Sequence, residues 1–375
     1  MSTENKYKVL IVGGGVGGMS AAMAMSRKGM DVDLIDIDPD WKAIGAGITI
    51  TGPTLRAFHE LGVYDDIKEV AYVGQDIQVC DVNGNYIRRL ETPMMPNSPT
   101  EGSGGIMRPT LHKILSKHTL ATGVNVRLSL TVDALDQDDE GVDVTFSDGS
   151  KGRYDLVVGA DGVFSKVRSL IMPDAPKPEY TGQSAWRIMA PRPKDIDCRH
   201  YFLGGPHKVG LTPTSDDEMY MFLLERTPRE WREQDELHDG LKELLAEYGG
   251  IIGELRDSIT PETDINFRPL EAFHLPAPWN IGRVLLIGDA AHPTTPQLAS
   301  GAGIAVEDAI VLAEELADAN SVAETMDRFM TRREPRCRLV VESSIKIGEL
   351  EQARAPVEEQ TAVVQNALAK LKEPI

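Results

Sequence analysis

Short apolar runs alternate with a glycine cluster and a helix-forming stretch at the start of the chain. Residues 8–12 (KVLIV) are continuously apolar, the pattern of a strand that is buried on both faces. Residues 13–18 are mostly glycine, residues 19–28 are rich in Ala and Met, and residues 32–35 are again apolar up to Asp36. This order predicts a strand, a tight turn, a helix and a second strand, which together form a βαβ unit.

Farther along, strand and helix patterns alternate before the chain becomes mostly helical. Helices are expected at 54–61 and 111–122, in one or two segments within 229–256, and over most of the chain from 302. Strands are expected in a hairpin at 75–90, in a meander of 124–128, 131–135 and 142–146, in buried runs at 156–158 and 283–287, and through 181–225, with loops at 44–48 and 91–105. The pattern predicts a Rossmann-like α/β domain interleaved with a mixed β-sheet domain and followed by a helical C-terminus.

Composition and charge exclude several classes of protein. The 375 residues include 39 Lys and Arg against 58 Asp and Glu, a net charge of -19, whereas binding to nucleic acid or an anionic membrane requires a basic face. No run reaches the about 18 apolar residues of a membrane span, and no signal peptide is predicted. Cys80, Cys198 and Cys337 are too widely spaced for a disulfide framework or a paired-cysteine zinc site. We therefore expect a cytoplasmic protein without a metal centre.

The glycine cluster has the spacing of a phosphate-binding turn. A GxGxxG pattern follows the first strand and opens the first helix, whose N-terminal N–H groups can bind a pyrophosphate. Asp36 comes 21 residues after Gly15, where a carboxylate accepts hydrogen bonds from an adenosine ribose. The pattern predicts dinucleotide binding, without choosing between FAD and NAD, by Gly13, Gly15, Val16, Gly17, Gly18 and Asp36.

Two further motifs each follow a buried strand. Residues 154–168 (YDLVVGADGVFSKVR) and 282–312 (GRVLLIGDAAHPTTPQLASGAGIAVEDAIVL) place an aspartate at the carboxyl end of the strand, where open α/β sheets bind ligands. With the three motifs in this order, nearly the whole chain resembles the class A flavoprotein monooxygenases, the para-hydroxybenzoate hydroxylase-like family. It is most similar to the shorter salicylate-, urate- and hydroxynicotinate-type members.

The resemblance implies a division into three parts. The FAD-binding domain would comprise 1–72, 98–180 and 265–330, the substrate domain 73–97 and 181–264, and the C-terminal helices 331–375. Asp289 would bind the ribityl hydroxyls, Arg108 the ribityl-phosphate region, and Pro296 would lie beside the isoalloxazine ring. Other implied cofactor residues are Gly47 in the IGAGI motif, Asp161 with Arg168, and the helix start Gly301, Ala302 and Gly303. The family often has Glu then Arg after the second strand, whereas this chain has Asp36-Ile37-Asp38, which leaves the arginine contact with adenosine in doubt.

The implied reaction consumes NADH or NADPH and molecular oxygen. Reduced FAD would form a C4a-hydroperoxide that hydroxylates a small aromatic or heteroaromatic substrate. Tyr220, Lys208, Gln297 and Thr49 would face this substrate, with His207 as a further candidate and Pro296 shaping the pocket. His292 is expected to support its loop, and His200, Tyr201 and Arg187 are left open as pocket or structural residues.

Two other functions stay open at this point. One is an FAD-dependent reductase or dehydrogenase of the same fold, which inserts no oxygen. The other is a flavin-fold binding module that has lost catalysis, although the intact motifs around Asp289 and Pro296 argue against it. The sequence leaves open both the choice between NADH and NADPH and the choice between a monomer and a homodimer.

Overall fold

A computed structural model describes residues 7–43 and 45–375 of the protein. Its first sheet has six strands, parallel except at one edge, where β18 pairs antiparallel with β19. In spatial order they are β18 (Asn280–Ile281), β19 (Val284–Leu286), β12 (Leu156–Gly159), β1 (Lys8–Val12), β2 (Asp31–Ile35) and β8 (Asn125–Arg127). In β1, Ile11 lies between Leu34 of β2 and Val158 of β12. The predicted βαβ unit is thus confirmed, with α1 (Val16–Arg27) as its helix.

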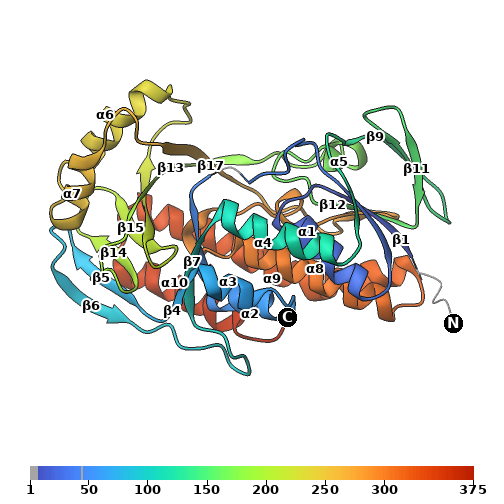
Figure 1. The fold of residues 1–375 in the computed structure, drawn as a ribbon, viewed down its shortest axis with the longest axis horizontal. Helices are drawn as coiled ribbons and strands as arrows, with labels where there is room; N and C mark the ends of the chain where they lie inside the picture. The colour runs from blue at the N-terminus through green and yellow to red at the C-terminus, as the bar shows by residue number, and fades with distance from the viewer. Residues whose placement is uncertain (1–6, 44) are drawn as a thin grey trace.

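The second sheet has seven strands and mixed pairing. Its order is β17 (Ile265–Ala272), β13 (Glu179–Pro191), β16 (Glu218–Arg226), β15 (Lys208–Pro213), β14 (Arg199–Leu203), β5 (Ile77–Asp81) and β6 (Tyr86–Leu90). Figure 1 shows the two sheets toward opposite ends of the long axis, with α6 (Gln234–Leu244) and α7 (Gly250–Ser258) beside the seven-stranded sheet. Two three-stranded sheets complete the strands: β11 (Lys151–Tyr154), β10 (Val142–Phe146) and β9 (Val132–Gln137), and β3 (Gly47–Thr51), β7 (Ser103–Met107) and β4 (Tyr72–Gly74).

Helices occupy the space between and around the sheets. The remaining ones are α2 (Gly52–Glu60), α3 (Tyr64–Val70), α4 (Arg108–Ala121), α5 (Lys166–Ile171), α8 (Gly301–Asp318), α9 (Val322–Gln352) and α10 (Val357–Leu371). Helix α9 is 31 residues long and runs along the long axis in Figure 1. Among the described helices, none is both long and apolar enough to cross a membrane.

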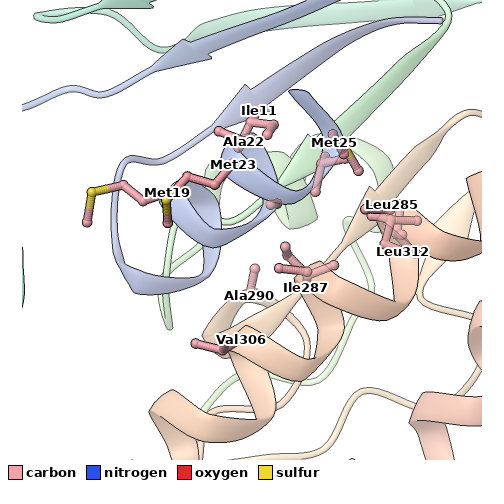
Figure 2. Close-up of a cluster of buried hydrophobic side chains, with 14 of the residues drawn as sticks. Ile11, Met19, Ala22, Met23, Met25, Leu285, Ile287, Ala290, Val306 and Leu312 are labelled. Atoms are coloured by element: carbon pink, nitrogen blue, oxygen red, sulfur yellow. The ribbon is translucent and has the colours of Figure 1, made fainter. Parts of the chain in front are cut away.

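The core beside the six-stranded sheet is built from side chains of α1, β1, β19 and α8. Figure 2 shows this cluster, which includes Ile11, Met19, Ala22, Met23, Met25, Leu285, Ile287, Ala290, Val306 and Leu312. Met and Ala pack closely between helix and strand, because Ala lets the two backbones approach and unbranched Met fills the irregular gaps. This packing holds the N-terminus of α1 and that of α8 on the same side of the sheet.

The structure corrects three local predictions. The run at 124–128 does not belong to the meander: its residues 125–127 form β8, which pairs parallel with β2, and β11 is the third strand of the meander. The expected loop at 44–48 becomes strand from Gly47, and the expected loop at 91–105 becomes strand from Ser103, because β3 and β7 pair with each other. Ile44, the first residue of the IGAGI motif, lies outside the described residues.

Candidate active site

The GxGxxG turn joins β1 to α1 at the carboxyl end of the sheet. Gly13 has a φ of +107°, and a Cβ there would lie 2.4 Å from the carbonyl oxygen of Ala160, so only glycine fits. A Cβ on Gly18 would lie 1.8 Å from the carbonyl oxygen of Gly13, which explains the close packing of helix on strand. The space in front of Gly15, by contrast, is open to 4 Å. No side chain caps α1 at Gly15, so the first N–H groups of the helix are available to a phosphate.

A cavity of about 280 Å³ extends from this turn past the end of β2. Asp36 lines it and accepts hydrogen bonds from the backbone N–H of Gly14 (2.5 Å) and Asp38 (2.7 Å). Trp41 also lines it, and its indole N–H donates to the Gly14 carbonyl oxygen (2.9 Å). His112 packs edge-on against the Trp41 ring, with ring centroids 5.6 Å apart.

A second cavity, of about 470 Å³, continues from the first and lies between the two sheets. One wall is the turn at residues 288–290, where Gly288 has a φ of +57° and the Asp289 side chain opens onto the cavity. Burial raises the pKa of the Asp289 carboxyl, while His292 and Arg108 counteract that rise. Farther along this wall, Pro296, Gly301 and Ala302 line the cavity at the uncapped N-terminus of α8.

Arg108 lines both cavities. Among the described residues, no acceptor for its guanidinium is found, so this cation is available where the two cavities meet. The unbonded N–H groups of α1 and α8, the open face of Gly15 and this free guanidinium all fit an anionic dinucleotide. The residues of the cavity wall that would hold the dinucleotide are Gly15, Val16, Gly17, Arg108, Asp289, Pro296, Gly301 and Ala302.

Three other predicted cofactor residues have structural contacts. Gly303 packs against α2, since a Cβ there would lie 2.3 Å from Oγ1 of Thr54. Gly47 lines the cavity, and a Cβ there would lie 2.3 Å from the Tyr220 ring. Asp161 accepts hydrogen bonds from Ser165 Oγ (2.5 Å) and from the Lys166 N–H (2.7 Å), the first N–H group of α5, so it supports the helix start that Ser165 caps.

Behind the Asp289 turn lies a buried network of charges. Asp308 of α8 accepts the Gly288 N–H (3.0 Å), His292 Nε2 (2.7 Å) and Arg333 Nε (2.8 Å). Burial disfavours the charged form of His292, yet Cys337 and Asp308 hold the pKa of its imidazole well above 6.5. One nitrogen, oxygen or sulfur atom each of His292, Asp308 and Cys337 lies within 4.8 Å of the others, but Asp308 is already neutralised by the His292 imidazole and the Arg333 guanidinium. His292 thus supports the loop, as the sequence predicts.

The opposite wall comes from the seven-stranded sheet and β3. Tyr220 and Phe222 line the cavity from β16, where alternate residues point to opposite faces of the sheet. The Tyr220 hydroxyl is 2.7 Å from Thr49 Oγ1, which in turn is 3.1 Å from Thr212 Oγ1. Tyr220 and Thr49, predicted from segments far apart in the sequence, therefore meet in one place.

Lys208 and Gln297 also reach the cavity, but both contact a residue that sequence reasoning missed. Glu351, near the end of α9, forms an ion pair with Lys208 Nζ at 2.5 Å and accepts from Gln297 Nε2 at 3.4 Å. Gln297 Nε2 also donates to Gln183 Oε1 (2.9 Å). Lys208 is thus already neutralised by a carboxylate 143 positions away, and no local sequence signal reveals this pair.

His207 is not among the residues that line the cavity. Its backbone N–H donates to the Tyr248 hydroxyl (3.2 Å), and burial lowers the pKa of its imidazole. The residues left open in the sequence divide into two groups: Arg187 and Tyr201 line the cavity, whereas His200 is buried and bonds the Cys198 carbonyl oxygen through Nδ1 (2.9 Å). Arg199, which the sequence did not single out, also lines the cavity and contacts the Tyr201 hydroxyl.

Comparison with known proteins agrees with this geometry. The FAD binding domain family matches residues 6–344, so the chain belongs to that family. The putative FAD-dependent monooxygenase YetM of Bacillus subtilis is 32% identical over 90% of this chain and 92% of its own length. An FAD-dependent urate hydroxylase of Klebsiella pneumoniae is 27% identical over 89% and 88%. The crystal structure of Klebsiella pneumoniae HpxO with FAD and uric acid has the same fold, with a TM-score of 0.84 and 24% identity over 98% of this chain and 93% of that chain.

Fold and relatives together define an FAD-dependent flavoprotein monooxygenase of class A. The predicted family, fold class, cofactor and enzyme class are thus confirmed.

Proposed function

We propose that the protein uses NADH or NADPH, molecular oxygen and bound FAD to hydroxylate a small aromatic or heteroaromatic substrate. The observation that carries this proposal is the second cavity. Its cofactor wall holds Asp289 and Pro296, and its facing wall presents the rings of Tyr201, Tyr220 and Phe222. A wall of aromatic rings favours a flat ring as ligand, because the side chains bury its face and contact its edges. When bound, the flavin supplies electron transfer and oxygen activation.

The residues of the chain orient the substrate and exclude water. Tyr220 and Thr49 form a hydroxyl pair at 2.7 Å, which can relay a proton from a substrate hydroxyl: as Tyr220 accepts that proton it gives its own to Thr49, and the Thr49 proton leaves to solvent. Gln297 directly follows Pro296, so its amide lies at the edge between the two walls, held by Gln183. Lys208, paired with Glu351, closes the cavity from β15.

The relatives support a range of ring systems. Besides urate hydroxylase, a 3-hydroxybenzoate 6-hydroxylase of Polaromonas naphthalenivorans is 28% identical over 92% of this chain. We further infer the three-part division given above with two boundaries moved: β17 (Ile265–Ala272) belongs to the substrate domain because it pairs with β13, and the C-terminal helices begin with α9 at Val322. We also infer a cytosolic location, which the three free, buried cysteines support.

A substrate panel tests the proposal. The FAD-loaded protein is mixed with NADH or NADPH and each aromatic compound, and pyridine-nucleotide oxidation, oxygen uptake and product mass under ¹⁸O₂ are followed. We expect at least one compound to stimulate oxidation and to gain one labelled oxygen atom. Stimulated oxidation without label in any product would instead identify a reductase or dehydrogenase of this fold.

Tyr220→Phe tests the proposed proton path, with Tyr86→Phe as a matched control, because Tyr86 is an exposed residue of β6. Loss of the Tyr220 hydroxyl should lower the fraction of consumed NAD(P)H that yields product, while the control keeps it. Full coupling in Tyr220→Phe would remove Tyr220 from this role.

A further inference from the structure

On the substrate side of the cavity, away from the unpaired Arg108 of the cofactor side, one arginine has no counter-ion among the described residues. Arg187 lies in the middle of β13, where its neighbours Trp186 and Ile188 are buried in the core beneath α6 and α7. Since alternate residues of a strand point to opposite faces, Arg187 points the other way and lines the cavity. It is paired in register with Phe222 on β16 and Asn266 on β17, so neither neighbouring strand brings an acid opposite it.

The other cations on this side of the cavity already have partners. Lys208 forms its ion pair with Glu351 at 2.5 Å. Arg199 contacts the Tyr201 hydroxyl and Ser103 Oγ (3.3 Å). For Arg187, no hydrogen-bond acceptor or counter-ion is found within residues 7–43 and 45–375. Asp289 is the acid of the cavity wall, but it belongs to the cofactor side, where His292 and Arg108 are the charges that act on it.

Arg187 is half-buried, and its guanidinium loses part of its hydration without gaining a partner, which is costly. Burial lowers the pKa of Arg187, Tyr220 raises it in part, and Arg108 adds repulsion. Even so, a guanidinium stays protonated in proteins. A ligand that carries a negative charge would remove this cost, and a planar carboxylate matches the fork of guanidinium donors.

We propose that Arg187 selects substrates with an anionic oxygen, a carboxylate or an ionised ring hydroxyl, attached to the aromatic ring. This inference rests on the proposed function, since it names the charge class of the same substrate. The anion would lie against β13 beneath Phe222, with the ring extending toward Pro296.

Matched pairs of ligands that differ only in charge test the proposal. The FAD-loaded protein is titrated with 3-hydroxybenzoate and 3-hydroxybenzamide, and with salicylate and salicylamide, and the dissociation constant is taken from the change in flavin absorbance. We expect the wild type to bind at least one acid about ten- to a hundredfold more tightly than its amide, the range for a hydrogen bond to a charged group. Arg187→Met should abolish this preference, and Arg187→Lys should keep part of it.

Arg268→Met is the matched control. Arg268 lies on the neighbouring strand β17, is exposed and stacks near Trp231, so its loss should leave the acid-to-amide ratio unchanged. Equal binding of acids and amides by the wild type, no spectral change with any acid, or a preserved preference in Arg187→Met would each overturn the proposal.

Three outcomes distinguish this inference from a role in cofactor binding and from the proposed hydroxylation. If Arg187→Met weakens FAD binding but keeps the acid preference, Arg187 serves the cofactor and the inference is wrong. If acids bind in an Arg187-dependent way but no compound gains labelled oxygen, the anion preference stands and the proposed hydroxylation fails. If only neutral compounds gain labelled oxygen, at equal rates in wild type and Arg187→Met, the proposed hydroxylation stands and the anion preference is wrong.

Discussion

Asp308 is the buried carboxylate that connects the Asp289 turn to helix α9, and Asp308→Asn removes its charge at nearly constant volume. The side chains of Asp308 and Arg333 are both fully buried, at 0% exposure, and their charged atoms are 2.8 Å apart. Burial alone would raise the pKa of Asp308, but His292 and Arg333 lower it to about 2, so the carboxylate is ionised at neutral pH. Its removal leaves Arg333 with Glu307 (2.9 Å) as its remaining ion-pair partner.

The size of the effect follows from these contacts. Removing one partner of a buried ion pair costs about 3 to 5 kcal/mol, and we expect about 3 kcal/mol because Arg333 keeps Glu307. For 375 residues with an unfolding entropy of about 2.1 cal/mol/K per residue, this loss lowers the melting temperature by about 4 °C. The Gly288 N–H also loses a charged acceptor, so FAD retention should fall together with stability.

Differential scanning calorimetry and flavin absorbance after gel filtration measure both effects. Glu349→Gln is the control, because this carboxylate lies on the same helix as Arg333 and forms an exposed pair with Lys346 at 3.4 Å. Such a pair contributes about 0.5 kcal/mol or less, which is below 1 °C here. A shift in Asp308→Asn no larger than that of Glu349→Gln would refute the role assigned to the buried network.

Three further predictions follow from individual contacts. Asp289→Ala should weaken FAD binding to the apoprotein about ten- to a hundredfold, as measured by quenching of flavin fluorescence, and an unchanged dissociation constant would remove its assigned role. Glu351→Gln should free Lys208 and tighten binding of 3-hydroxybenzoate about two- to fivefold, so equal or weaker binding in the same absorbance titration would contradict that pairing. The raised pKa of His292 means that its stabilising contribution is complete below its ordinary pKa of 6.5 and is lost as the pH rises through the raised value. His292→Asn should therefore flatten the decline of melting temperature with pH above 6.5, and an unchanged slope would contradict this.

The cofactor side could be predicted because its elements are local. In the glycine turn, strand, helix start and Asp36 lie within one short segment. Gly13 and Gly18 are required by contacts that a Cβ would break, whereas Gly15 leaves the space in front of it open. The location of the run at 124–128 could not be predicted in the same way. An apolar run of this length fits either sheet, and only pairing with β2 decides which one it joins.

The substrate side depends on contacts between distant segments. Thr49 and Tyr220 are 171 positions apart, and Lys208 and Glu351 are 143 apart. The resemblance could suggest that Lys208 faces the pocket, but it could not show that a carboxylate from the C-terminal helix neutralises it. Arg187 carried a weak signal, an arginine between two core positions of a strand. It gains a role only because no described residue pairs with it.

Helix α9 carries both Arg333 and Glu351, one behind the Asp289 turn and the other at the substrate cavity. At 1.5 Å per residue, the 18 positions between them make a rod about 27 Å long. The last residue of α9, Gln352, also ties the helix to β13 of the seven-stranded sheet, since its side chain donates to the Thr181 carbonyl oxygen (3.0 Å). If this helix tilted or slid, both walls of the second cavity would move with it. One continuous helix therefore sets the spacing between the cofactor wall and the facing wall. Neither wall can therefore be repositioned, by evolution or by engineering, without adjusting the other.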